Sequence, residues 1–524
     1  MRIVSGVHYR WLIVALLVAG CAQAVLTPAL HTPGALPAKG LKDGALKVHM
    51  RSGELYQLTT WSLVDSARLI RGPGTRYTID RQATASESIS VSLDSVALFE
   101  TNSHDETYAL GLQGVGALAV LGGIMSVSCL ADPKSCFGSC PTFYMEGADS
   151  ARVRAEGFSA SVAKVLESRD VDALGRVESS GRELAIHMRN EAWETHFVRG
   201  VNVLAVPVAS GDRIFASSDS TFVRATDIVS PRTCSAPEGD CLPSMSRTDD
   251  VERFSSADST DLAAREVVEL TFAAAPSDAG VVITARNSLV TTFLFYQTMA
   301  YVGSQFGATL ASMERGDRQS AERSFGMAKL LGGIDVQLRD ARGEWRTIGT
   351  YLEAGPIASD TKVIRLPRRD ASEQGPLQVR LRMAKGSWRV DRVALAALGG
   401  TVSPIRVRPS RAERRGKDDA TALATLRSGV QHLVLLPGDD VRLVFELPQR
   451  ADSLELFLES EGYYYEWMRR EWLAEENFAM AALVVAAPAE GLRRLAPAYH
   501  TREAGMENVF WASRFNRRVS NATH

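Results

Sequence analysis

Apolar and polar residues alternate with a period of two along most of this chain. Leu46, Val48 and Met50 alternate with polar neighbours, which is the pattern of a strand with one buried face. The alternation is clearest between 333 and 398, where four apolar residues within Leu377–Met383 are separated by Gln and Arg. These patterns predict a mainly β, multidomain protein, with a small β-barrel or sandwich followed by β-sandwich domains.

Breaks in the alternation divide the chain into consecutive segments. A polar, proline-containing composition marks two linkers, and a stripe of apolar residues three or four apart predicts one helix at Leu294–Glu314. The predicted segments are a signal peptide (1–20), a Pro- and Ala-rich tether (21–45), a small β domain (46–104), an apolar Gly-rich segment (105–130), a central β domain (131–229), a polar linker (230–262), strands with a helix and a β-sandwich (263–400), a basic linker (401–425) and a C-terminal unit of strands and helix (426–524).

The C-terminal unit is expected to contain three strands before it turns helical. Apolar alternation predicts these strands near His432–Leu436, Asp440–Leu447 and Leu454–Leu458. The aromatic stretch Gly462–Leu473 is expected to enter a helix.

The run Ala109–Cys129 carries no charged side chain. Its length matches what a helix needs to cross a bilayer, about 20 residues. Its many glycines make it weakly hydrophobic, so a buried helix or hairpin is the alternative, and we prefer burial. Gly114–Ala119 within the run matches a dinucleotide-binding fingerprint, but no alternation of strands and helices follows, so we reject that interpretation.

The N-terminal residues have the features of a secretory signal. A positively charged start precedes the short apolar core Trp11–Val18, which is too short to span a membrane. The sequence VAGC, ending at Cys21, resembles the lipobox of bacterial lipoproteins. The resemblance implies a diacylglycerol on Cys21, and Ala22 in the next position favours the outer membrane. We therefore expect a lipid-anchored protein of the bacterial cell envelope.

The overall composition is that of an ordinary globular protein. Hydrophobic residues make up 45% and charged residues 23% of the 524 residues, with a formal net charge of −2. Because no basic segment dominates, we expect no nucleic-acid partner. The expected partners are a membrane, through Cys21, and an envelope protein or a glycan.

Five cysteines follow Cys21 and are candidates for a disulfide, a free thiol or a metal ligand. They are Cys129, Cys136, Cys140, Cys234 and Cys241. An odd number leaves at least one thiol unpaired. Cys234 and Cys241 flank a short polar loop and form the preferred pair, while the sequence does not choose a partner for the other three.

The segment Cys136–Pro141 resembles the copper-binding motif of the thioredoxin-fold chaperones that assemble cytochrome oxidase. Soft thiolates suit Cu(I). The chain departs from that motif at Phe137, where the family has proline, and the surrounding pattern is not an alternating β/α fold. A disulfide involving Cys129, or buried thiols, is therefore the preferred interpretation.

Two further groups of residues are candidates for chemistry. His187, Glu191, Glu194 and His196 are metal-ligand types, but they show no recognised zinc spacing, so hydrogen bonding within the fold is preferred. The stretch Gly157–Ser161 falls one residue short of a Gly-x-Ser-x-Gly nucleophile elbow, and no base or oxyanion hole accompanies it.

An aromatic cluster near the C-terminus is a candidate ligand-binding surface. Flat aromatic faces can stack on sugar rings, although core or domain-interface packing explains such residues more often. The cluster comprises Tyr463, Tyr464, Tyr465, Trp467 and Trp472.

Cys21, the segment DPKSCFGSCPTFY and the segments EGFS and NEAWETH together resemble a group of bacterial envelope lipoproteins. This resemblance brings no activity with it. Because we find no catalytic constellation and no cofactor motif, the preferred function is a non-catalytic scaffold or binding module. A carbohydrate-binding or carbohydrate-active protein is second, and a thiol or copper protein at Cys136 and Cys140 is third.

Overall fold

The computed structural model divides the chain into two units, within residues 1–125 and 126–524. Strand accounts for 52% of the described residues and helix for 20%, which confirms the predicted mainly β class. The structure describes residues 26–31, 46–50, 54–64, 67–77, 83–104, 140–147, 152–178, 183–192, 194–218, 221–305, 309, 325–353, 355–368, 375–436, 438–448, 453–466 and 475–512.

The first unit is one antiparallel sheet of seven strands. Its strands run in the order β1-β7-β2-β3-β5-β4, with β6 also paired to β5. The alternation predicted for the residues of β2 is present, because Leu46 and Val48 are fully buried between half-exposed neighbours. The strands are β1 (Leu26–His31), β2 (Leu46–Met50), β3 (Leu55–Leu58), β4 (Ser62–Val64), β5 (Leu69–Tyr77), β6 (Ala83–Ser92) and β7 (Val96–His104).

Strand β1 lies inside the range 21–45 that composition assigned to a tether. It pairs antiparallel with β7 from Leu26 to His31. A sequence rich in proline and alanine carries no strand period, so only its pairing with a distant strand shows that it belongs to the sheet.

The second unit begins with a β-sandwich built from two sheets. A six-stranded sheet in the order β26-β25-β28-β11-β8-β9 packs on a sheet in the order β10-β29-β12-β24, in which β27 also pairs with β12. The strands of this first sandwich are β8 (Thr142–Met145), β9 (Val153–Glu156), β10 (Ser168–Glu178), β11 (Glu183–Arg189), β12 (Glu194–Val208), β24 (Ile405–Val407), β25 (Pro409–Arg414), β26 (Lys417–Asp418), β27 (Leu433–Leu435), β28 (Asp440–Glu446) and β29 (Ser453–Glu466).

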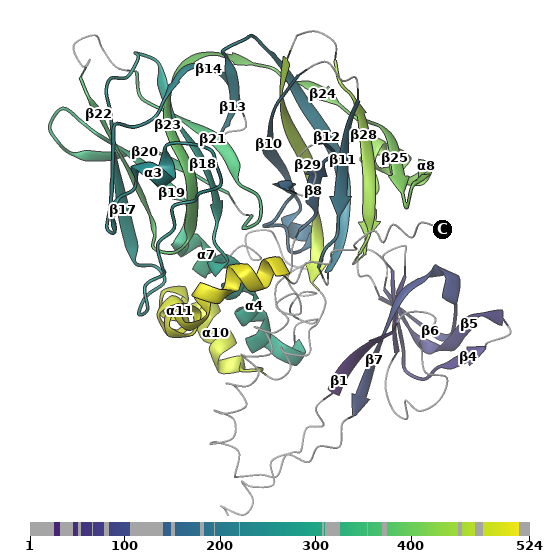
Figure 1. The fold of residues 1–524 in the computed structure, drawn as a ribbon. Helices are drawn as coiled ribbons and strands as arrows, with labels where there is room; N and C mark the ends of the chain where they lie inside the picture. Colours follow the sequence, from purple (N-terminus) through teal and green to yellow (C-terminus); the bar gives the residue numbers. More distant parts are fainter. Residues whose placement is uncertain are drawn as a thin grey trace, which may run out of the picture. The chain divides into compact units, whose positions relative to one another are not determined.

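A closed five-stranded barrel and a further six-stranded sheet form the other half of this unit (Figure 1). One side of the barrel packs on the first sandwich through Ile214 and Phe222, and the opposite side packs on the last sheet through Val281 and Leu395. The barrel strands are β13 (Arg213–Ser217), β14 (Phe222–Val229), β18 (Ala279–Asn287), β21 (Asp360–Arg365) and β23 (Trp388–Val402). The last sheet contains β15 (Thr233–Ala236), β16 (Gly239–Asp240), β17 (Arg265–Phe272), β19 (Ile334–Arg339), β20 (Trp345–Tyr351) and β22 (Leu377–Ala384).

The helices gather mainly at one end of the second unit, where α4, α7, α10 and α11 share a core (Figure 1). Phe293 of α4 lies 5.2 Å from Tyr499 of α11, measured between ring centroids. The helices are α3 (Leu242–Met245), α4 (Val290–Val302), α7 (Gly326–Leu331), α8 (Ala420–Ser428), α10 (Phe478–Ala486) and α11 (Pro488–Ala512), and the 3-10 turns are η2 (Leu93–Ser95), η4 (Lys164–Leu166) and η5 (Gly303–Gln305).

Four sequence predictions differ from this structure. The ranges 230–262 and 401–425 are folded parts of the second unit and not linkers, since they contain β15, β16 and α3 in the first case and β24 to β26 and α8 in the second. The helix predicted at Leu294–Glu314 begins at Val290 and ends at Val302, because Gly303 turns the backbone with a φ of 51°. Residues 462–466 continue strand β29 and do not start a helix.

The apolar run Ala109–Cys129 lies outside the described residues. Among the described residues, no helix combines the length and the apolar character needed to cross a bilayer.

Candidate functional site

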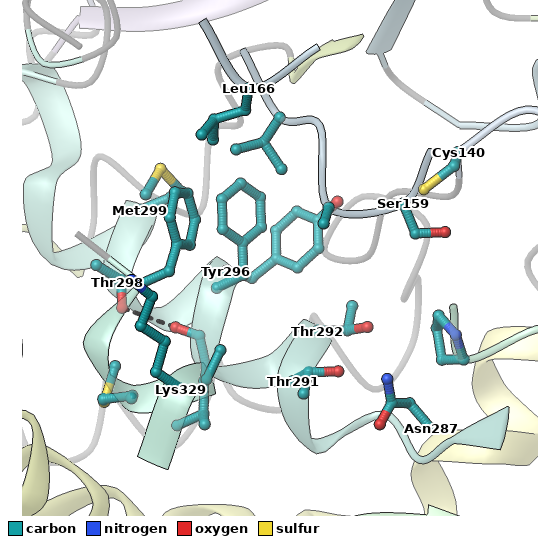
Figure 2. A pocket seen from close by; sticks show the side chains of 18 of the residues that line it. Cys140, Ser159, Leu166, Asn287, Thr291, Thr292, Tyr296, Thr298, Met299 and Lys329 are labelled. Carbon is teal, nitrogen blue, oxygen red and sulfur yellow. Dashed lines mark hydrogen bonds between the residues drawn. The ribbon is translucent and has the colours of Figure 1, made fainter. Parts of the chain in front are cut away.

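A cavity of about 630 Å³ lies where the first sandwich, the barrel and the helical end meet. Its walls come from the turn after β9, the end of β29, helices α4 and α7, and the loop after β20. Figure 2 shows Cys140 and Ser159 on one side of this pocket, with Met299 and Lys329 on the other.

Helix α4 supplies one wall of the pocket through residues spaced by a helical turn. Thr291, Phe295 and Met299 are four residues apart and therefore share one face of the helix. The hydroxyl of Thr298 donates to the carbonyl oxygen of Leu294 (2.7 Å), so it is satisfied within the helix (Figure 2). The exposed surface of the pocket is mostly apolar as a result of these residues and their neighbours.

A buried carboxyl group, Glu156, forms the polar part of the opposite wall. Its Oε2 accepts the backbone N–H of Ile357 (2.8 Å), and its side chain is 2% exposed. The pKa of Glu156 is raised to about 7, mainly because the group is buried, with a smaller contribution from the nearby charge of Glu353 and an opposing one from the hydrogen bonds that it accepts. A group of this kind is an acceptor when ionised and a donor when protonated.

The backbone has two unusual features close to the Glu156 carboxyl group. Phe158 holds a φ of 41°, a conformation uncommon for a non-glycine residue, and it leads directly into Ser159 on the pocket wall. At Gly355 an added Cβ would lie 2.5 Å from the Glu156 Oε2. A larger residue at position 355 would therefore displace the Glu156 carboxyl group from its present position.

A second carboxyl group lines the pocket at the end of β29. Glu466 is 6% exposed and accepts a hydrogen bond from the hydroxyl of Tyr296 on α4. Next to it, the Tyr464 hydroxyl donates to the Ser159 carbonyl oxygen (3.1 Å). The hydrogen bond between Tyr296 and Glu466 links the helical wall to the sandwich wall.

The structure separates the candidate cysteines. Cys140 lines the pocket as a buried free thiol, and burial raises the pKa of that thiol well above its usual value. A neutral thiol is a poor nucleophile and a poor metal ligand. Cys234 and Cys241 form a disulfide, as the sequence predicted, elsewhere in the second unit. Cys21, Cys129 and Cys136 lie outside the described residues.

The histidine and glutamate candidates lie in separate hydrogen-bonded groups. His187 lies between Asp440 (Nδ1 to Oδ1, 2.8 Å) and Glu146 (Nε2 to Oε1, 3.0 Å). His196 contacts Glu194 (2.7 Å) within the core. Glu191 instead accepts hydrogen bonds from the hydroxyls of Thr142 and Tyr144, both at 2.8 Å. The structure does not bring these four residues together in one site. Their hydrogen bonds are consistent with a structural role in the fold.

The aromatic cluster does not form an exposed platform in the part that the structure describes. Tyr463 is fully buried and stacks on Phe197, with ring centroids 4.7 Å apart. Tyr465 is buried beside it, at 2% exposed. Of the three tyrosines only Tyr464 reaches the pocket, while Trp467 and Trp472 lie outside the described residues.

Several polar residues that line the pocket are not among the candidates found in the sequence. Glu156, Asn287, Glu353 and Glu466 come from strands or loops far apart in the chain. None of them belongs to a recognised catalytic or binding motif, and only the packing of the sandwich on the helices places them around one cavity.

No protein-family model and no curated protein matches this chain. Among solved structures, a β-porphyranase of glycoside hydrolase family 86 from the gut bacterium Bacteroides plebeius aligns at 8% identity with a TM-score of 0.16, over 44% of this chain and 37% of the porphyranase. A structure of the Gt strain of infectious bursal disease virus aligns at 9% identity with a TM-score of 0.12, over 92% of this chain and 96% of that chain. These likenesses carry no conclusion about fold or activity.

Proposed function

We propose that this chain is a lipid-anchored, non-catalytic binding protein of the bacterial envelope, and that its second unit binds a mainly apolar ligand. The observation that carries the proposal is the pocket itself. At about 630 Å³ it has the size typical of small-molecule sites, and its apolar walls surround a few placed polar groups. A ligand would bury its apolar surface against α4, α7 and the sandwich wall.

The charged side chains around the pocket indicate the charge of the ligand's polar group. Three carboxyl groups line it, Glu156, Glu353 and Glu466, and among the described lining residues the basic side chain is Lys329. Lys329 lies on the far side from Ser159 (Figure 2). A cationic or hydrogen-bond-donating end therefore suits the wall near Glu156, whereas an anionic end would face like charges.

We expect an alkylamine to bind and the matching alkyl carboxylate to bind more weakly. Isothermal titration calorimetry with decylamine and decanoate measures this difference. Ala160 is exposed on the pocket wall, so Ala160→Trp should fill the entrance and weaken decylamine binding by about tenfold or more, which is about 1.4 kcal/mol.

The matched control is Ala424→Trp, which places the same side chain on the exposed face of α8, away from the pocket. It should bind decylamine as the unchanged protein does. Equal affinity in the Ala160→Trp and Ala424→Trp variants would contradict the pocket as the binding site. Preference for decanoate would contradict the role of the carboxyl groups.

Replacing Cys21 by serine should abolish incorporation of radiolabelled palmitate. The reason is that the lipid is carried by the thiol that follows VAG in the sequence, and two acyl chains on one cysteine supply stable membrane attachment. Cys140→Ser, which removes a buried thiol of the second unit, should leave labelling intact. Unchanged labelling of the Cys21→Ser chain would refute the anchor.

A further inference from the structure

Four carboxyl groups and one lysine meet where the first sandwich faces the barrel. Asp170 and Asp172 lie two residues apart on β10, and Asp360 and Lys362 lie two residues apart on β21. Residues two apart on a strand point to the same side. Glu353 joins them from the loop after β20, and one carboxylate oxygen each from Asp170, Asp172 and Glu353 lies within 4.8 Å of the other two.

The lysine compensates only part of this negative charge. Its Nζ lies 2.8 Å from Glu353 Oε2 and 3.0 Å from Asp360 Oδ2. The other oxygen of Asp360, Oδ1, accepts the backbone N–H of Ala173 (2.8 Å). The ammonium group thus contacts the two carboxylates on one side of the cluster, while the two aspartates of β10 have no bond to it among the described contacts.

A second observation, at Asp172, also points to a bound cation. Its side chain is 3% exposed, and its Oδ2 has no hydrogen-bond partner among the described residues. A buried, unpaired carboxylate oxygen is costly, so such groups are normally paired or bound to a metal. Burial, followed by the negative charge of Asp170, raises the pKa of Asp172 well above its usual value.

We propose that Asp170, Asp172 and Glu353 bind a Ca²⁺ ion that ties the first sandwich to the loop between β20 and the barrel strand β21. Carboxylate oxygens are the ligands that Ca²⁺ prefers, at about 2.3–2.6 Å. Oxygens within 4.8 Å of one another therefore fit around a single ion of this size. The smaller Mg²⁺ usually keeps several water ligands and binds only one or two carboxylates, whereas three protein carboxylates meet here.

The ion also has a structural consequence for the neighbouring pocket. Glu353 lines that pocket as well as belonging to the carboxylate cluster. Its backbone carbonyl accepts the side-chain amide of Asn287 (2.6 Å), another lining residue. Ca²⁺ bound at Glu353 would hold the loop after β20 in place. The cation site does not depend on the ligand proposed above.

Titration of Ca²⁺ into the chelator-treated, full-length protein tests this proposal. We expect one Ca²⁺ to bind per chain, measured by equilibrium dialysis with ⁴⁵Ca²⁺. At about 1 mM Ca²⁺, the concentration range of weak extracellular sites, the melting temperature of the second unit should rise by several degrees because binding favours the folded state.

Asp172→Asn should lose both the bound Ca²⁺ and the thermal shift. Without Ca²⁺ it should melt at the same temperature as the metal-free protein or higher, because asparagine has the shape of the buried carboxyl group and carries no charge. Asp418→Asn, on the exposed strand β26, is the control that keeps one Ca²⁺. If Asp172→Asn does not fold, Glu353→Gln provides the same comparison. Absence of Ca²⁺ binding in the unchanged protein, or full binding in Asp172→Asn or in Glu353→Gln, would overturn the proposal.

Discussion

Replacing Arg253 by methionine should lower the unfolding free energy of the second unit by about 3–5 kcal/mol, the usual cost of breaking a buried ion pair. Arg253 is 4% exposed and donates two hydrogen bonds to Glu266, from Nη1 (2.7 Å) and Nη2 (2.8 Å). The Glu266 side chain is 3% exposed. Methionine keeps the apolar stem but leaves that carboxylate buried without its counter-charge.

The double variant Arg253→Met with Glu266→Met should recover most of the loss. Replacing both members of a buried pair by apolar residues is often close to neutral. The remaining partner, Glu238, has a side chain that is 47% exposed and can return to water. Arg232→Met, an exposed arginine of the same segment, should change little. Chemical denaturation followed by near-ultraviolet circular dichroism measures all four proteins. An Arg253→Met variant as stable as the Arg232→Met control would show that the pair contributes nothing.

The contacts of Arg253 show why the composition of residues 230–262 wrongly predicts a linker. That range is rich in serine, aspartate and proline, a composition that favours loops. Its stability comes from distant partners, because the backbone N–H of Arg253 donates to Val390 on β23 (2.8 Å) and its side chain reaches Glu266 on β17. Neither contact leaves a local periodic pattern.

Strands with one buried face were predictable because their period is local. The alternation at Leu377–Met383 corresponds to β22, whose apolar residues are buried and whose Gln and Arg residues are half-buried. Strand β29 was predicted only in part, since all but one of its residues are buried. A strand covered on both faces loses the alternation, so Tyr463–Tyr465 carry no local sign that they belong to a buried strand.

The site was harder to predict than the fold. A disulfide between Cys234 and Cys241 follows from proximity in sequence. The pocket instead depends on how α4 packs on the turn at Ser159 and the end of β29. The pair of aspartates on β10 and the Asp360–Lys362 pair on β21 lie far apart in the sequence, and they meet only because the barrel closes against the first sandwich.

The unchanged protein should become less stable as the pH rises from about 4.5 to about 8. Replacing Glu156 by glutamine should abolish the part of this loss that is due to Glu156. The pKa of this buried carboxyl group is about 7 in the folded protein against an ordinary value of 4.5. The folded state therefore holds its proton more tightly than the unfolded state, and the associated stability is complete below pH 4.5 and is lost as the pH rises toward 7 and above. At about 1.4 kcal/mol per pH unit, the loss amounts to about 3 kcal/mol.

Glutamine is the informative replacement because it has the shape of the protonated carboxyl group and still accepts the N–H of Ile357. The two proteins should have similar unfolding free energies near pH 4.5, whereas near pH 8 the Glu156→Gln variant should be more stable by about 3 kcal/mol. Only the difference between them isolates Glu156, because the pKa values of Asp170 and Asp391 are also raised, to about 7 and about 6. Urea denaturation at several pH values, in a buffer that contains a chelator, measures this difference in unfolding free energy. A constant difference across that range would mean that Glu156 is ionised in the folded protein, and the pocket would then hold a permanent negative charge.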